Sequence, residues 1–217
     1  MVSVSLFVGQ VQALRQSGRP SGIYKTEVKG PIELGKNGFA GDHQADTQAH
    51  GGPEKAVHSY PAEHYVKLAA AFPDAATSLV AGSIGENIST KQIDEHDVHI
   101  GDIWQLGTAQ IQVCQPRNPC WKIDERFECD GMAAFIDKTL LTGWYWRVVQ
   151  PGVVSAGDVL SCLQPANQNM TLHGAMTLWR EHRPPLDALE RLSQTPGIAS
   201  SWRDKINQRL TYLKGLG

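Results

Sequence analysis

The chain has 217 residues, with 20 Lys and Arg against 22 Asp and Glu, and 41% of its residues are hydrophobic. A chain of this length suits one domain, or one with a small appendage, and buries roughly 70% of its unfolded surface without disulfides. This composition excludes an intrinsically disordered chain and indicates no nucleic-acid surface. No apolar run approaches the length of a transmembrane helix, and the N-terminus lacks the basic start of a secretory signal. We expect a cytoplasmic globular protein without a membrane partner.

The charge is distributed unevenly along the chain. Residues 1–170 hold 13 Lys and Arg against 18 Asp and Glu, whereas residues 171–217 hold 7 against 4. We interpret the basic end as a solvated helical face rather than a docking patch. The four cysteines, Cys114, Cys120, Cys129 and Cys162, show no pairing pattern, so we expect free thiols in a reducing compartment.

The first two thirds of the chain are predicted to consist largely of strands. Alternating or apolar stretches indicate strands at residues 2–8, 23–28, 56–60, 103–106, 110–114, 145–149 and 159–163. Gly-Asp pairs at 41–42, 101–102 and 157–158 are typical of turns. One helix is expected to begin at Pro61 and to end before Pro73. This pattern predicts a mainly β fold, a closed or partly closed barrel with embedded helices.

The composition changes at the polar segment 164–169, which is suited to a linker. Three short helices are expected beyond it. The first is capped by Thr171, the second is centred on Leu189, and the third begins at Ser200 or Ser201. We therefore predict a barrel domain at 1–165 and a three-helix extension at 166–217. Helices with so few residues bury little apolar surface by themselves. We therefore expect them to pack against the barrel or against a second subunit, with a homodimer as one option.

The most constrained local sequence is Gln115-Pro116-Arg117-Asn118-Pro119-Cys120. Each proline favours an extended conformation with three residues per turn, which places Arg117 and Cys120 on the same side. A guanidinium beside a thiol favours the thiolate and offers a planar anchor for phosphate. The alternative is a small buried cysteine that follows a rigid loop.

A second candidate is His50-Gly51-Gly52-Pro53-Glu54-Lys55. Consecutive glycines let the backbone approach a ligand and expose N–H groups to an anion, which His50 and Lys55 would bracket. A plain tight turn is the alternative. A third segment, Gly85-Glu86-Asn87, would supply polar groups to a pocket or merely close a turn.

A hydrolytic metal site is an alternative that the spacing does not favour. Its candidate ligands would be Asp42, His43, Asp46, His50, His58 and His64. They match no familiar ligand helix, and the gaps between the cysteines differ from those of structural zinc sites.

Taken together, these segments resemble the MOSC domain family in order and approximate spacing. The motifs that carry the resemblance are His50-Gly51-Gly52-Pro53, Tyr60-Pro61, Gly85-Glu86-Asn87, Gly101-Asp102 and Gln115-Pro116-Arg117-Asn118-Pro119-Cys120. The resemblance continues into the helical extension and covers nearly the whole chain. It implies a β-barrel that binds the molybdenum cofactor, with Cys120 as the thiolate ligand of the metal. It also implies reduction of N-hydroxylated bases such as 6-hydroxylaminopurine, a detoxifying activity.

The resemblance also implies cofactor-binding roles for other residues of these segments. The candidate partners of the cofactor's phosphate and pterin are His50, Gly51, Gly52, Lys55, Asn87, Arg117, Asn118 and Lys122. His50 and His43 are candidate proton donors. The chain has no flavin, haem or iron–sulfur motif, so a separate protein would supply electrons. Alternative functions are a molybdopterin carrier and a cysteine-based sulfur-handling protein. We expect the extension to serve assembly or donor contact, because every candidate ligand precedes residue 123.

Overall fold

The computed structural model describes residues 2–47, 51–166 and 170–215. Its strands are β1 (Val2–Ser3), β2 (Ser5–Val8), β3 (Gln12–Ala13), β4 (Pro20–Ser21), β5 (Thr26–Val28), β6 (Ile32–Gly35), β7 (Gly38–Phe39), β8 (Val57–Pro61), β9 (Ile88–Thr90), β10 (Ile103–Leu106), β11 (Ala109–Pro116), β12 (Trp144–Gln150), β13 (Gly152–Val154) and β14 (Val159–Gln164). Its helices are η1 (Pro53–Lys55), α2 (Glu63–Ala71), η2 (Pro73–Ser78), α3 (Lys122–Phe127), α4 (Met132–Thr139), α5 (Leu172–Arg180), α6 (Leu186–Ser193) and α7 (Ser200–Lys214).

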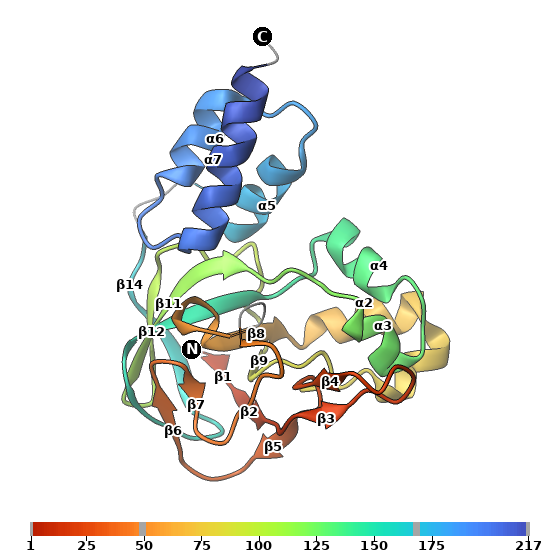
Figure 1. Cartoon of the computed structure of the whole chain (residues 1–217). Helices are drawn as coiled ribbons and strands as arrows, with labels where there is room; N and C mark the ends of the chain where they lie inside the picture. The colour runs from red at the N-terminus through yellow and green to blue at the C-terminus, as the bar shows by residue number, and fades with distance from the viewer. Residues whose placement is uncertain (1, 48–50, 167–169, 216–217) are drawn as a thin grey trace.

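The main sheet has nine strands in the order β1-β14-β10-β11-β12-β8-β9-β2-β5. All of its pairs are antiparallel except β8 and β9, so the sheet is mixed. β1 and β2 are separated by Val4 alone, yet they pair with β14 and β9 near opposite ends of the order. The sheet therefore curls into a half-barrel with helices around it (Figure 1).

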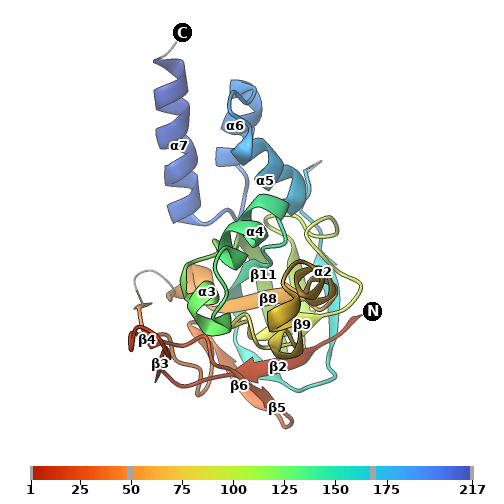
Figure 2. The same cartoon turned by 90° about the vertical axis from the view of Figure 1, so that its right-hand side faces the viewer.

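The prediction of a mainly β fold is not confirmed, because about 31% of the chain is helical and 26% is strand, and of the closed or partly closed barrel that was predicted, the closed form is not confirmed. The unpredicted helices α3 and α4 contribute to this result. Neither has a side-chain hydrogen bond at its N-cap, and Trp121 and Gly131 occupy those positions. Short helices without capping side chains give little sequence signal. With α2, they cover one side of the curled sheet (Figure 2).

The expected strands and the four expected helices are present. β11 extends from Ala109 to Pro116 and pairs with β10 and β12. α2 ends at Ala71 with Phe72 as its C-cap, directly before Pro73. Thr171 caps α5, and its hydroxyl accepts a hydrogen bond from the backbone N–H of Gly174 over 3.1 Å. The sequence predicts these helices because they have apolar residues at helical spacing, as Leu189 and Leu192 of α6 do, or a capping residue, as α5 does.

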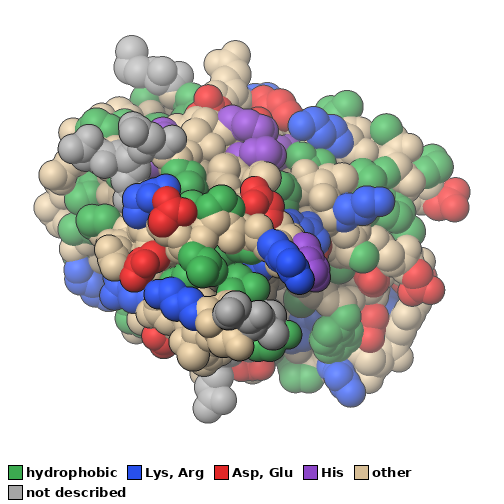
Figure 3. All heavy atoms as spheres, turned by 90° about the horizontal axis from the view of Figure 1, so that it is seen from above, with side chains coloured by type: hydrophobic (Ala, Val, Ile, Leu, Met, Phe, Trp, Pro, Cys, Tyr) green, Lys and Arg blue, Asp and Glu red, His purple; other side chains and the backbone are tan. Residues whose placement is uncertain are grey.

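The C-terminal helices α5–α7 stand at one end of the sheet (Figures 1 and 2). One apolar cluster includes sheet residues such as Val113 together with Leu172, Leu189 and Ile206 of the three helices. The apolar core therefore continues across the predicted boundary at 165/166, and that division stays a prediction. Seen from this end, Lys and Arg side chains are interspersed with Asp and Glu (Figure 3). No helix of the described residues is long and apolar enough to cross a membrane.

Candidate functional site

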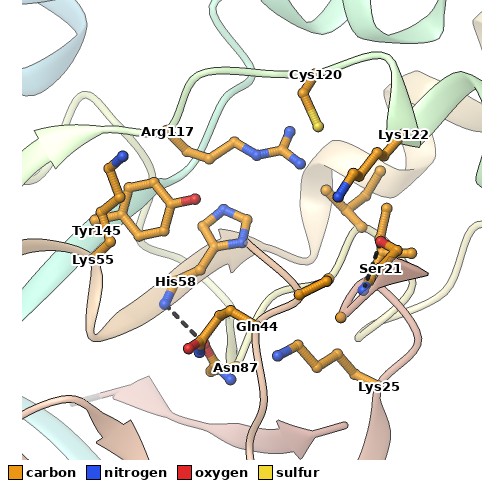
Figure 4. Close-up of a pocket in the computed structure, with 15 residues that line it drawn as sticks. Ser21, Lys25, Gln44, Lys55, His58, Asn87, Arg117, Cys120, Lys122 and Tyr145 are labelled. Atoms are coloured by element: carbon orange, nitrogen blue, oxygen red, sulfur yellow. Dashed lines mark hydrogen bonds between the residues drawn. The ribbon is translucent and has the colours of Figure 1, made fainter. Parts of the chain in front are cut away.

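The segment after β11 carries two side chains into one pocket. Arg117 is buried and Cys120 is half-buried, and both line the pocket (Figure 4). Asn118, between them, is exposed and is not among the residues that line it. The predicted same-side placement of Arg117 and Cys120 is therefore what the structure shows, and it follows from the extended backbone that the two prolines favour.

Several chain segments that lie far apart in the sequence meet at this pocket. The ten lining residues labelled in Figure 4 are Ser21, Lys25, Gln44, Lys55, His58, Asn87, Arg117, Cys120, Lys122 and Tyr145. Five of these, Lys55, Asn87, Arg117, Cys120 and Lys122, are cofactor-site candidates from the sequence, and His58 was a candidate ligand of the metal alternative. Four basic side chains line the pocket with one cysteine, and of these Lys25 is ion-paired with Asp42, so the pocket is suited to an anionic ligand through Lys55, Arg117 and Lys122.

The guanidinium of Arg117 lacks a charge partner in the described part of the chain. Arg117 is 6% exposed, and its Nη1 atom has no hydrogen-bond partner there. None of the ion pairs among the described residues includes Arg117. Its side chain hydrogen-bonds the hydroxyl of Tyr145, and its backbone N–H donates to the carbonyl of Gly143 over 3.1 Å. A buried cation with an unused donor is costly unless an anion accompanies it.

The side chains of His58 and Tyr145 line the same pocket, and both are neutral. Burial, reinforced by the Arg117 cation, holds the pKa of His58 well below its ordinary value. Burial raises the pKa of Tyr145, although Arg117 acts in the opposite direction. Near neutral pH, the positive charge in this part of the pocket therefore belongs to Arg117 rather than to the imidazole.

Asn87 braces the wall of the pocket through both ends of its amide. Its Oδ1 accepts a hydrogen bond from the backbone N–H of His58 over 3.1 Å (Figure 4). Its Nδ2 donates to the carbonyl of Phe7 over 3.2 Å and to Oδ2 of Asp42 over 2.9 Å. Both amide hydrogens are thus committed within the protein, so Asn87 acts as a support for the pocket wall.

Lys25 and Asp42 form part of this support, and sequence reasoning missed Lys25 and the role of Asp42 as its partner. Asp42 was interpreted as part of a Gly-Asp turn and as a candidate ligand of the metal alternative, not as the partner of a lysine. Lys25 comes just before β5, in a stretch that predicts nothing but a strand. No local signal connects residues 17 positions apart, so only the fold brings the lysine and the carboxylate together.

The glycine-rich segment forms a turn in its described part. Gly52 has a φ of 92°, and its carbonyl accepts a hydrogen bond from the backbone N–H of Lys55 over 2.9 Å. Lys55 lines the pocket, whereas Gly51 and Gly52 do not. His50 lies outside the described residues. Residues 52–55 therefore form the tight turn that was the alternative interpretation, and this turn places the Lys55 side chain in the pocket lining.

Two further candidates take different positions. Lys122 begins α3 and lines the pocket, and its Nζ donates to the carbonyl of Pro20 over 3.1 Å. His43 is exposed, and it is not among the pocket-lining residues. The structure therefore brings Lys122, but not His43, to the site around Cys120.

The metal-cluster alternative gains no support from the described residues. Among them, no group of three or more His, Cys, Asp and Glu side chains is placed to hold a metal ion. His64 instead forms a buried pair with Glu95 over 2.8 Å. All four cysteines are free thiols, and burial raises the pKa of Cys114 to about 12. Cys120 is the cysteine that reaches the basic pocket.

Comparison with known proteins agrees with this arrangement. The MOSC domain family model matches residues 46–161. Protein YiiM of Escherichia coli (strain K12) is 37% identical over 207 residues, which are 95% of this chain and 91% of that protein. The crystal structure of YiiM from Escherichia coli has a TM-score of 0.82 at 31% identity and covers 97% of this chain and 92% of that one. A protein named "Reductase" from Gibberella moniliformis (strain M3125 / FGSC 7600) is 32% identical over 177 residues, 81% of this chain but 31% of that protein. This chain belongs to the MOSC domain family.

Proposed function

We propose that this protein is a molybdenum-cofactor-dependent reductase of N-hydroxylated bases such as 6-hydroxylaminopurine. The observation that carries the proposal is the buried Arg117 guanidinium, which has no ion-pair partner among the described residues and shares its pocket with Cys120. The pterin of the cofactor bears a phosphate, an anion that would satisfy such a cation. The relative from Gibberella moniliformis that is named "Reductase" supports the reaction class.

The donor set of the pocket fits this cofactor. The free Nη1 of Arg117 and the ammonium groups of Lys55 and Lys122 would hold the phosphate. The Cys120 thiolate is a soft ligand of the kind that suits molybdenum coordinated by sulfur. Asn118 is exposed, and Gly51 and Gly52 lie outside the pocket lining. We therefore place the binding role on the side chains rather than on the glycine amides.

The reaction converts R–NH–OH, two electrons and two protons into R–NH₂ and water. When bound, the molybdenum cofactor supplies the two-electron chemistry that removes the oxygen. Cys120 would fix its orientation, and Arg117 would bind its phosphate. His58 is neutral in this pocket, so it can accept or donate a hydrogen bond to the substrate without adding a cation. A separate donor protein would supply the electrons.

The test is to measure molybdenum and pterin in freshly purified protein, together with turnover of 6-hydroxylaminopurine by reduced methyl viologen. We expect both components to be bound and adenine to be formed. Pterin without turnover would support the molybdopterin carrier instead. A persulfide on Cys120 without molybdenum would support the sulfur-handling alternative. Either result would overturn the proposal.

A further inference from the structure

The carboxylate of Glu54 joins the glycine-rich turn to the C-terminal extension. Its Oε2 accepts hydrogen bonds from the backbone N–H of Ser200 over 2.9 Å and from the hydroxyl of Ser200 over 2.7 Å. Its Oε1 accepts a hydrogen bond from Nη2 of Arg147 over 2.5 Å, and the two side chains form an ion pair. Ser200 is the first residue of α7, so this contact connects η1 with the start of that helix.

Electrostatics at Glu54 favour its ionised form. Burial acts to raise the pKa of Glu54, but the hydrogen bonds from Ser200 and Arg147 prevail, and the pKa lies below its ordinary value of 4.5. At neutral pH the carboxylate is therefore charged, and both contacts are charge-assisted hydrogen bonds, which are stronger than neutral ones.

The backbone of Glu54 is held as well. Its carbonyl accepts hydrogen bonds from Sγ of Cys114 over 3.0 Å and from Nε2 of Gln115 over 3.0 Å. The carbonyl of Cys114 in turn accepts a hydrogen bond from the backbone N–H of Ala199 over 2.9 Å. The end of β11 thus contacts the turn on one side and the start of α7 on the other.

Arg147 extends the same connection to the loop before α7. Its Nη1 donates to Oε1 of Gln112 over 3.0 Å and to the carbonyl of Gly197 over 3.3 Å. One guanidinium therefore contacts the sheet, the turn and the extension. This arrangement leaves little freedom for α7 to move without displacing Glu54.

The residue that follows Glu54 is Lys55, which lines the pocket. Burial lowers the pKa of Lys55, and the neighbouring charge of Lys205 on α7 lowers it further, against the opposing effect of Asp46. α7 therefore influences the pocket lysine in two ways. It holds the preceding residue by hydrogen bonds, and it places a second cation near the ammonium group.

We propose that the C-terminal extension contributes to anion binding in the pocket. In this proposal Ser200 and Glu54 are positioning residues that fix the position of Lys55. This inference rests on the proposed function, because it assumes that Lys55 binds the anion. It differs from the expectation that the extension serves only assembly or donor contact. A partner that binds the extension and shifts α7 would then change ligand affinity through Glu54.

The experiment is a titration of the full-length, cofactor-free protein with inorganic phosphate, followed by calorimetry and accompanied by a thermal melt. The variants are Ser200→Ala, Ser200→Thr, Lys55→Met, and the double variant with Ser200→Ala and Lys55→Met. Ser201→Ala is the matched control, because Ser201 is the exposed neighbouring residue on the same helical turn. Glu54→Gln tests the contact from its other side.

We expect Ser200→Ala to weaken phosphate binding about 3- to 10-fold, the effect of losing roughly one hydrogen bond of ordinary net strength. Ser200→Thr, which keeps the hydroxyl, and Ser201→Ala should bind as the wild type does. The double variant should bind no more weakly than Lys55→Met alone, because Ser200 acts through Lys55. If Ser200 had only a structural role, Ser200→Ala would change the melting temperature, and the effects of Ser200→Ala and Lys55→Met on phosphate affinity would not show this non-additivity.

Wild-type affinity in Ser200→Ala and Glu54→Gln, with weaker binding in Lys55→Met, would overturn the inference and leave the anion pocket intact. Fully additive losses in the double variant would also overturn it. If the wild-type protein bound no phosphate, the anion pocket itself would fail, and the proposed function would fail with it.

Discussion

Lys25 and Asp42 form a buried ion pair in the wall of the pocket. Nζ of Lys25 lies 2.5 Å from Oδ1 of Asp42, and their side chains are 4% and 1% exposed. The same carboxylate accepts hydrogen bonds from the backbone N–H of Gly9 over 2.9 Å and from Asn87. It therefore balances the lysine charge and also holds the amide that supports His58.

We expect Asp42→Asn to destabilise the protein by about 3–5 kcal/mol, because it leaves the Lys25 ammonium buried without its counter-charge. Urea unfolding monitored by tryptophan fluorescence measures this change. Glu27→Gln is the control, since Glu27 is an exposed carboxylate close by on β5. A loss below about 1 kcal/mol, the value usual for exposed pairs, would show that the ion pair does not support the wall.

Arg117→Met removes the buried charge and keeps most of the side-chain volume. We expect the free energy of unfolding to stay the same or to rise, because an apolar side chain replaces a cation without a carboxylate partner in the described residues. Phosphate affinity should fall about 10- to 150-fold, the equivalent of 1.5–3 kcal/mol. Urea unfolding and calorimetry measure the two quantities. Strong destabilisation with unchanged phosphate affinity would contradict an anion-binding role.

Cys120→Ser replaces a soft ligand with a hard hydroxyl of nearly the same shape. We expect the fold and pterin content to remain, and turnover of 6-hydroxylaminopurine and molybdenum content to fall. The corresponding variants of Cys114, Cys129 and Cys162 are controls, because none of these residues lines the pocket. Turnover in Cys120→Ser within about threefold of the wild type, or about 0.65 kcal/mol of barrier, would falsify the assignment.

The Glu54 carboxylate should make stability depend on pH. Its pKa is lower in the folded protein, so its contribution is fully present above the ordinary glutamate pKa and is lost as pH falls through the folded pKa. The stability difference between wild type and Glu54→Gln should therefore be constant from about pH 5 to 7 and should shrink toward pH 3. Urea unfolding at each pH provides the comparison. A difference that grew on acidification would have the wrong sign.

Gly143→Ala should distort the meeting point of β8 and β12. Gly143 has a φ of 66°, and a Cβ atom there would lie 2.2 Å from the backbone oxygen of Ser59. We expect a loss above about 2 kcal/mol, more than the 1–2 kcal/mol of a left-handed backbone alone. Gly157→Ala is the matched control, with a φ of 86° and open space around its Cβ position. Equal losses in the two variants, measured by thermal melting, would rule out the steric effect.

Local sequence patterns determined the elements that have strong periodicity or clear ends. Alternation predicts the strand that becomes β10, and Thr171 predicts the start of α5, because both signals lie within a few neighbouring residues. The two prolines around Arg117 likewise predict that its side chain and Cys120 share a side. These features depend on local backbone preferences, which a single sequence contains.

The tertiary structure decided the helical share, the half-barrel and the walls of the pocket. α3 and α4 have no side-chain hydrogen bond at the N-cap, and they form through packing in an apolar cluster with α2 and Tyr60 of β8 rather than through local preference. The pairing of Lys25 with Asp42, and of Glu54 with Ser200, joins residues 17 and 146 positions apart. Such pairs depend on how the sheet curls and where α7 docks, and no period or spacing in the chain encodes those distances.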